Sequence, residues 1–204
     1  MTSWGMVFDL RRCIGCNACT VACKQENSLP DGIFFTKTLS AEIGTYPNVT
    51  RTYIPTICNQ CEDAPCERVC PSGATYTSDD GIVMVDAEKC IGCGSCAVAC
   101  PYDQRSLMDP KLLKDGLFHD GSLTPFEEQG YERFIAGTMV KCDFCSERVS
   151  SGLEPACVAT CPTDARIFGD LDDANSKARR LIRERGGRQP LPQKNTKPKV
   201  YYVD

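Results

Sequence analysis

Cysteine is the residue type in this chain whose number and spacing point to chemistry. Sixteen cysteines occur in 204 residues, a share typical of disulfide scaffolds or metal-binding proteins. Each belongs to one of four groups of four, which we call quartets one to four, and none is left over. The quartets are Cys13, Cys16, Cys19 and Cys23; Cys58, Cys61, Cys66 and Cys70; Cys90, Cys93, Cys96 and Cys100; and Cys142, Cys145, Cys157 and Cys161.

The spacing within the quartets favours iron–sulfur clusters. Quartets one and three have the pattern C-x2-C-x2-C-x3-C of bacterial ferredoxins. A loop with a cysteine at every third residue wraps three corners of a 4Fe-4S cubane, and the fourth cysteine ligates the other cluster of a pair. A proline follows the fourth cysteine in quartets two, three and four. We therefore expect the fourth cysteine to begin a helix, because proline suits a first helical turn.

Disulfides and zinc are the alternative uses of these cysteines. Disulfides need no three-residue periodicity, and cysteines so close in sequence are difficult to pair without strain. Structural zinc sites typically combine two separate C-x2-C pairs. Quartets two and four could imitate that arrangement, whereas quartets one and three could not.

The ferredoxin crossing rule assigns all sixteen cysteines to four 4Fe-4S clusters. Cys70 and Cys90 are only 20 positions apart, so quartets two and three should form one pair, and quartets one and four are left to form the other. Each ligand set is named here by its first cysteine. The sets are Cys58, Cys61, Cys66 and Cys100; Cys90, Cys93, Cys96 and Cys70; Cys13, Cys16, Cys19 and Cys161; and Cys142, Cys145, Cys157 and Cys23.

Short apolar runs should form the strands that lead into these cluster loops. Residues 6–10, 53–57 and 82–85 are such runs, and a turn at 78–81 should join 74–77 to 82–85 as a hairpin. Short helices are expected after Cys19, Cys66, Cys96 and Cys157. The fold class predicted is α+β, with two interleaved ferredoxin-like double-cluster units and extensive loops.

Pairing the first quartet with the last predicts one folding unit over residues 1–204 rather than two separate domains. Residues 107–137 are long for a link between motifs, and are either a surface insertion or a contact surface for a partner. Residues 175–185 should form a basic surface helix. The tail 186–204 is expected to be disordered alone and to contact a partner. The remaining segments are an inner cluster pair at 58–100 and an outer pair built from 1–57 with 138–185.

Charge and hydropathy exclude several classes of function. The net charge of −4 argues against a nucleic-acid partner. No apolar run approaches the length that spans a bilayer, and the N-terminus lacks the features of a signal peptide. We therefore expect no signal peptide or transmembrane helix of its own, which leaves a cytoplasmic location or co-export with a partner open. No nucleophile–base pair or phosphate loop is present, so the chain is predicted to be non-catalytic.

Two of the cysteine motifs resemble those of a known family. Residues 58–66 and 70–74 are similar to the second cysteine motif, and residues 141–145 and 157–162 to the fourth, of the four-cluster iron–sulfur subunit of dimethyl sulfoxide reductase family molybdopterin oxidoreductases. Polysulfide and respiratory arsenate reductases have such subunits too. The resemblance implies a separate large subunit, with a molybdenum or tungsten pterin, that performs the chemistry. This chain would pass electrons to or from it, in some complexes from a membrane subunit that oxidises quinol.

Cations beside the motifs would balance the negative charge of the clusters. A cubane core of +2 with four thiolates carries about −2 when oxidised. The candidates are Arg12, Lys89, Lys141 and Arg148. Two other functions stay open on the sequence alone, a free-standing polyferredoxin that shuttles electrons and a zinc-binding interaction module.

Overall fold

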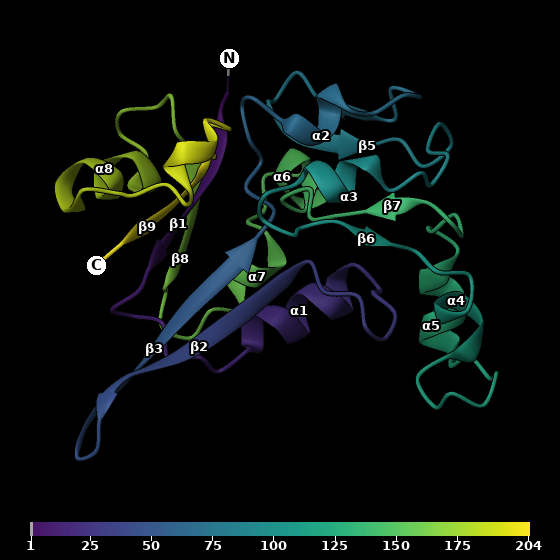
Figure 1. The fold of residues 1–204 in the computed structure, drawn as a ribbon, viewed down its shortest axis with the longest axis horizontal. Helices are drawn as coiled ribbons and strands as arrows, with labels where there is room; N and C mark the ends of the chain where they lie inside the picture. The colour runs from purple at the N-terminus through teal and green to yellow at the C-terminus, as the bar shows by residue number, and fades with distance from the viewer. Residues whose placement is uncertain (1) are drawn as a thin grey trace.

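The apolar run near the N-terminus forms the central strand of a three-stranded sheet in the computed structural model, which describes residues 2–204. Strand β1 (Trp4–Asp9) pairs antiparallel with β8 (Arg166–Asp170) and parallel with β9 (Val200–Val203). All residues of β1 after Trp4 are buried, as expected for a central strand covered on both faces. The sheet therefore joins the beginning and the end of the chain (Figure 1).

Four short helices each carry the third cysteine of a quartet, which confirms the expected helices. Helix α1 packs against α7, and α2 packs against α3. Each helix begins one residue before its cysteine, earlier than expected. Their bounds are Ala18–Glu26 for α1, Pro65–Arg68 for α2, Ser95–Ala99 for α3 and Ala156–Ala159 for α7.

The expectation that the fourth cysteine begins a helix was wrong. Cys100 is the C-cap of α3, with extended φ and ψ of −77° and 111°, and Cys70 and Cys161 lie just after the ends of α2 and α7. A proline disfavours helical geometry at the residue before it, so here it ends a helix. Quartet one has Lys24 in place of the proline, and its helix continues to Glu26.

Two hairpins supply further strands. The short hairpin of β4 (Thr75–Thr77) and β5 (Val83–Val85) confirms the predicted turn between them. Strands β2 (Thr36–Thr45) and β3 (Asn48–Ile57) form a longer hairpin that extends away from the rest of the molecule (Figure 1). The sequence predicted only the last residues of β3, because the exposed half of this hairpin lacks an apolar pattern.

The segment 107–137 lies on one side of the molecule (Figure 1) and is closed at its base by strands β6 and β7. A capping box between Thr124 and Glu127 begins its longer helix, α5. The remaining elements complete an α+β fold. Their bounds are Ser106–Leu107 for β6, Leu112–Asp115 for α4, Pro125–Tyr131 for α5, Met139–Val140 for β7, Ser146–Ser150 for α6 and Lys177–Arg185 for α8, with a 3₁₀ turn at Pro192–Lys194.

The C-terminal tail is ordered within the chain, which corrects the expectation of disorder. Val200 and Val203 are fully buried against β1. Before β9, the tail also runs beside the loop of quartet two. There the amide of Glu62 donates to the carbonyl of Lys197 at 3.0 Å, and the tail's own Lys199 amide donates to Asn59 at 2.9 Å.

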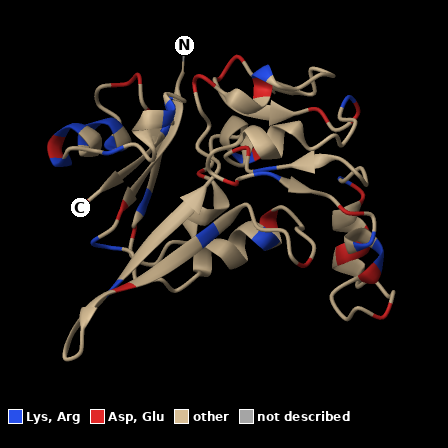
Figure 2. Cartoon of the chain, viewed as in Figure 1, with Lys and Arg blue, Asp and Glu red and all other residues tan. Residues whose placement is uncertain are grey.

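Helix α8 confirms the predicted basic helix, and Figure 2 shows it at the edge of the molecule with its Lys and Arg positions in blue. Ser176 caps its N-terminus. At its other end, Arg185 binds the buried carboxylate of Asp9 on β1, with Nη2 and Oδ1 2.9 Å apart. None of the helices between residues 2 and 204 combines the length and the apolar character needed to cross a bilayer.

Candidate iron–sulfur sites

All sixteen cysteines are free thiols, so they remain available as ligands rather than forming disulfides. Cys16 and Cys93, the second cysteines of quartets one and three, are exposed. The others are buried or half-buried. A structural zinc site gathers its ligands around a single metal ion. Within residues 2–204, no three His, Cys, Asp or Glu side chains are gathered in that way.

One cavity brings together three cysteines of quartet two and the fourth cysteine of quartet three. Burial raises the pKa of Cys61 to about 12 against a hydrogen bond with Thr196 that lowers it, and the charges of the three neighbouring thiolates add a smaller increase. Buried thiolates so close together need a cationic centre to stay deprotonated. The four cysteines that line the cavity are Cys58, Cys61, Cys66 and Cys100.

A second cavity brings together three cysteines of quartet four and the fourth cysteine of quartet one. Burial raises the pKa of Cys142 well above its usual value, and the charge of Cys23 adds to this effect. Met6, Ile57 and Phe144 supply apolar walls. The four cysteines that line the cavity are Cys142, Cys145, Cys157 and Cys23.

The cysteines of the two remaining sets influence one another electrostatically. Burial raises the pKa of Cys13, and the charges of Cys19 and Cys161 raise it further. A hydrogen bond with a serine hydroxyl lowers the pKa of Cys93, while the charge of Cys70 opposes that shift. The fourth cysteines of quartets four and two therefore lie near quartets one and three, respectively.

Backbone amides point at several of the sulfurs. Amide donors to sulfur stabilise the thiolate and are one means by which a protein tunes a cluster. Although burial opposes it, such donors and the Ser72 hydroxyl lower the pKa of Cys70 to about 7. The contacts are Thr75 to Cys70 at 3.4 Å, Ala165 to Cys161 at 3.3 Å, Met139 to Cys90 at 3.4 Å and Phe144 to Cys142 at 3.5 Å.

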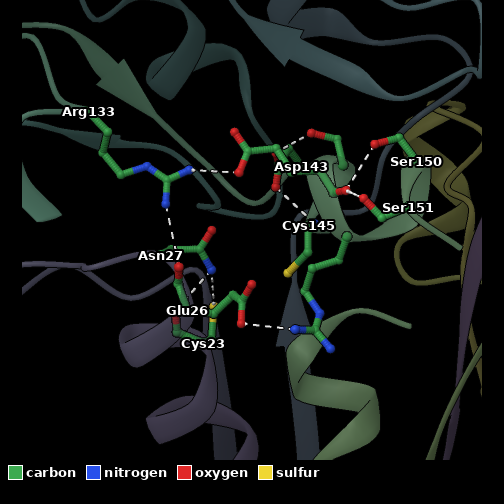
Figure 3. Close-up of polar contacts among 11 residues, drawn as sticks. Cys23, Glu26, Asn27, Arg133, Asp143, Cys145, Ser150 and Ser151 are labelled. Atoms are coloured by element: carbon green, nitrogen blue, oxygen red, sulfur yellow. Dashed lines mark hydrogen bonds and ion pairs between the residues drawn. The ribbon is translucent and has the colours of Figure 1, made fainter. Parts of the chain in front are cut away.

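Polar contacts hold the end of α1 beside quartet four (Figure 3). The side-chain amide of Asn27 donates to the carbonyl oxygen of Cys23 at 3.0 Å and to its sulfur at 3.6 Å. Glu26 accepts from Arg148 of α6 at 3.2 Å. Arg133, from the segment after α5, donates to the backbone carbonyl of Glu26 at 3.5 Å. The contact between Glu26 and Arg148 ties the end of α1 to the quartet-four region although more than a hundred residues separate them.

The predicted cations differ in their surroundings. Arg12, Lys89 and Arg148 pair with carboxylates, at 3.7, 2.8 and 3.2 Å respectively. Lys141 is buried, and its ammonium donates to the carbonyl of Cys142 at 2.7 Å.

Sequence reasoning missed two buried arginines beside the thiols, Arg105 and Arg166. Both follow a fourth cysteine in the pattern C-P-x-D-x-R, which residues 100–105 and 161–166 share. That repeat was a signal from which they could have been found. Each guanidinium has one buried nitrogen with no hydrogen-bond partner within residues 2–204. Cluster sulfur is an acceptor that suits such donors, so the residues present fit iron–sulfur clusters.

Comparison with known proteins agrees with this chemistry. A family model described as a 4Fe-4S dicluster domain matches residues 49–112 and 107–171, and a second model of the same description matches residues 12–74. Sixteen cysteines together with these matches fit four 4Fe-4S clusters. The chain therefore carries four such clusters and transfers electrons.

Similar proteins match along almost the whole chain. The iron–sulfur subunit ArrB of arsenate respiratory reductase from Shewanella sp. strain ANA-3 is 39% identical over 98% of this chain and 95% of its own length. A subunit of the selenate reductase of Mesobacillus selenatarsenatis is 41% identical over 98% of this chain and 71% of its own length. A subunit of the polysulfide reductase of Wolinella succinogenes is 36% identical over 98% of this chain and 93% of its own length.

Proposed function

Because this protein is a member of the family of iron–sulfur subunits of arsenate, selenate and polysulfide reductases, we propose that it relays electrons to or from a large catalytic subunit that carries a molybdenum or tungsten pterin. A membrane subunit that oxidises quinol is the proposed partner at the other end. The chain itself supplies the path, and the partners supply substrate and quinone chemistry.

The proposal assigns the sixteen cysteines to the Cys58, Cys90, Cys13 and Cys142 sets. The observation that carries it is the make-up of the two cavities, in each of which three cysteines of one quartet meet the fourth cysteine of another. This is the crossing that a two-cluster ferredoxin uses. With this crossing, residues 58–100 would hold the inner cluster pair, and the segments 1–57 and 138–185 would hold the outer cluster pair. The two proposed units then interleave.

Neighbouring thiols indicate the order of the path. The charge of Cys58 is one of the causes that raise the pKa of Cys142, after burial and the charge of Cys23. Together with the hydrogen bond from Gln60 to the carbonyl of Cys142, this supports a proposed order in which the Cys58 and Cys142 sets adjoin in the middle, with the Cys90 set beyond one and the Cys13 set beyond the other. The end sets contain the exposed cysteines, Cys93 and Cys16. Electrons would enter at one of these ends and leave at the other.

Serine variants of two cysteines from one quartet test the crossing. Cys96 lies in helix α3 and Cys100 is the C-cap of the same helix, but the proposal places the two cysteines in different ligand sets. We expect Cys100→Ser to alter the same reduced-state spin-resonance signal as Cys58→Ser, and Cys96→Ser to alter a different one. If Cys96→Ser and Cys100→Ser changed the same signal, the crossed sets would be wrong.

Purification under anaerobic conditions tests the role of the chain. We expect 16 irons and 16 acid-labile sulfides per chain, by counting four of each per cluster, and a much larger pterin-containing protein that co-purifies. A chain that carried the clusters but remained monomeric when co-expressed with the proteins encoded by neighbouring genes would instead be a free-standing polyferredoxin.

A further inference from the structure

Two buried arginines occupy matching places in the inner and outer halves of the molecule. Each lies five residues after a fourth cysteine, and in both cases the intervening aspartate adopts a left-handed conformation, with φ of 51° at Asp103 and 49° at Asp164. A non-glycine residue rarely takes this conformation outside tight turns. The same turn therefore precedes Arg105 and Arg166.

The partners of the two guanidinium groups match as well. Nη1 of Arg105 donates to the hydroxyl of Thr75 at 3.0 Å, and Nη2 of Arg166 donates to the hydroxyl of Thr36 at 2.8 Å. Arg105 is only 7% exposed and Arg166 only 4%, and both threonines are buried. The guanidinium of Arg166 also lies over the ring of Phe8, 4.9 Å from its centroid. These neighbours are neutral, so they do not compensate the positive charges.

An uncompensated buried charge is unfavourable by several kcal/mol, so a neighbouring anion is required. Cysteine thiolates supply the negative charge. Burial lowers the pKa of Arg105, but Cys66 and Cys96 raise it above its ordinary value. Arg166 shows the same balance between burial and the charges of Cys157 and Cys19.

The cysteines around each arginine come from two different ligand sets. Arg105 lines the cavity of the Cys58 set together with Cys66, and its charge also acts on Cys96 of the Cys90 set, so it faces both inner sites. Arg166 likewise faces the Cys142 set, through Cys157, and the Cys13 set, through Cys19. One nitrogen of each guanidinium, Nη2 of Arg105 and Nη1 of Arg166, is buried and has no hydrogen-bond partner within residues 2–204.

We propose that Arg105 and Arg166 are bridging cations, one for each cluster pair, which donate the free N–H toward cluster sulfur and raise the reduction potentials of both clusters that they separate. A cluster with its four thiolates changes from about −2 to about −3 when it accepts one electron from the reductant. A fixed positive charge between two such sites favours that electron on either of them. This inference rests on the ligand sets proposed above.

Glutamine variants separate this role from a structural one. In the complete anaerobically prepared protein, with its co-purifying subunits, Arg105→Gln and Arg166→Gln remove the charge but keep a polar side chain. Potentiometric titration followed by spin resonance measures each cluster. We expect each variant to lower the reduction equilibrium constant of the two clusters of its own pair at least tenfold, which corresponds to about 59 mV for one electron.

Arg51→Gln is the matched control, because Arg51 is an exposed arginine on the long hairpin and its loss should leave all four potentials unchanged. Unchanged potentials in both the Arg105 and the Arg166 variants would overturn the inference. So would an equal shift of all four clusters in either variant, since a bridging cation acts on one pair.

A measurement on the unmodified protein covers the case in which a glutamine variant fails to assemble its clusters. With ¹⁵N-labelled arginine, pulsed spin resonance of the reduced protein should show coupling between cluster spin and guanidinium nitrogen, and its absence would refute the donated N–H. Iron and sulfide content, together with the cysteine variants, tests the ligand sets separately. Complete clusters with unmoved potentials would reject the bridging role alone.

Discussion

At the scale of single residues, Gln60 connects the inner and outer halves of the molecule. It is fully buried, and its side-chain amide donates to the carbonyl of Cys142 at 2.7 Å while its oxygen accepts from the amide of Val83 at 2.8 Å. A primary amide both donates and accepts, so one side chain satisfies two buried backbone groups. Gln60 therefore holds the junction between the Cys58 and Cys142 sets.

We predict that Gln60→Leu, which is similar in size, weakens this junction. The substitution leaves the buried amide of Val83 without a partner, which costs about 1–3 kcal/mol, and leaves the carbonyl of Cys142 with the Lys141 ammonium as its remaining donor. The concentration of guanidinium chloride at which the iron–sulfur absorbance is half lost should fall. Gln25→Leu is the control, because Gln25 is exposed on α1 and should leave that midpoint unchanged. Equal midpoints for the Gln60 variant and the unmodified chain would show that the junction does not depend on these bonds.

At the scale of elements, the cluster loops depend on left-handed glycines at particular positions. Gly92 and Gly94 of quartet three have φ of 67° and 73°, a region that glycine occupies without steric cost. Their surroundings differ. A Cβ on Gly92 would overlap the carbonyl oxygen of Gly137, whereas a Cβ on Gly94 would meet no atom within 4 Å. The loop thus passes against a neighbouring backbone at one glycine and faces open space at the other.

The two glycines form a matched pair for a test. Gly94→Ala should cost only backbone strain, about 1–2 kcal/mol, and should retain four clusters. Gly92→Ala adds an overlap with backbone that no side-chain rotation relieves, so we expect it to lose the cluster of the Cys90 set. Iron and sulfide analysis after anaerobic purification measures the difference. Similar cluster content in both alanine variants would mean that the contact with Gly137 yields easily.

At the scale of the whole molecule, the C-terminal tail joins the two halves. Its first part bonds to the loop of quartet two through Lys197 and Lys199, and Thr196 is hydrogen-bonded to Tyr102 after quartet three. Its last part, β9, lies beside β1 in the sheet. β1 in turn leads directly into quartet one. The tail therefore contacts the loops of quartets two and three before it completes the sheet that leads into quartet one.

Removal of residues 200–204 should affect the outer pair selectively. Each of the buried valines, Val200 and Val203, contributes about 1.5–3 kcal/mol through burial, and β1 would lose its parallel neighbour. We expect the shortened chain to lose the clusters of the Cys13 and Cys142 sets and to keep about half its iron. A chain that lacks only Asp204, an exposed residue, is the control. Selective loss of the inner clusters would contradict this account of the tail.

The sequence by itself determined the chemistry, because cysteine spacing is local. A C-x2-C-x2-C-x3-C run places three sulfurs around one cubane whatever the rest of the chain does. It also predicted the hairpin of β4 and β5, the basic helix α8 and the short helices that carry Cys19, Cys66, Cys96 and Cys157. All of these depend on neighbours only a few residues apart.

Tertiary structure alone decided which distant groups meet. Arg105 and Arg166 resemble ordinary surface arginines until the fold buries them between thiols, and Gln60 gains its role only when quartet four packs beside quartet two. The tail looked disordered because its composition is polar, yet its last strand gains backbone partners and burial from β1, at the opposite end of the sequence. The repeated C-P-x-D-x-R pattern could have singled out the two arginines, but burial and long-range hydrogen bonds depend on the complete fold, so no local pattern could specify what these groups contact.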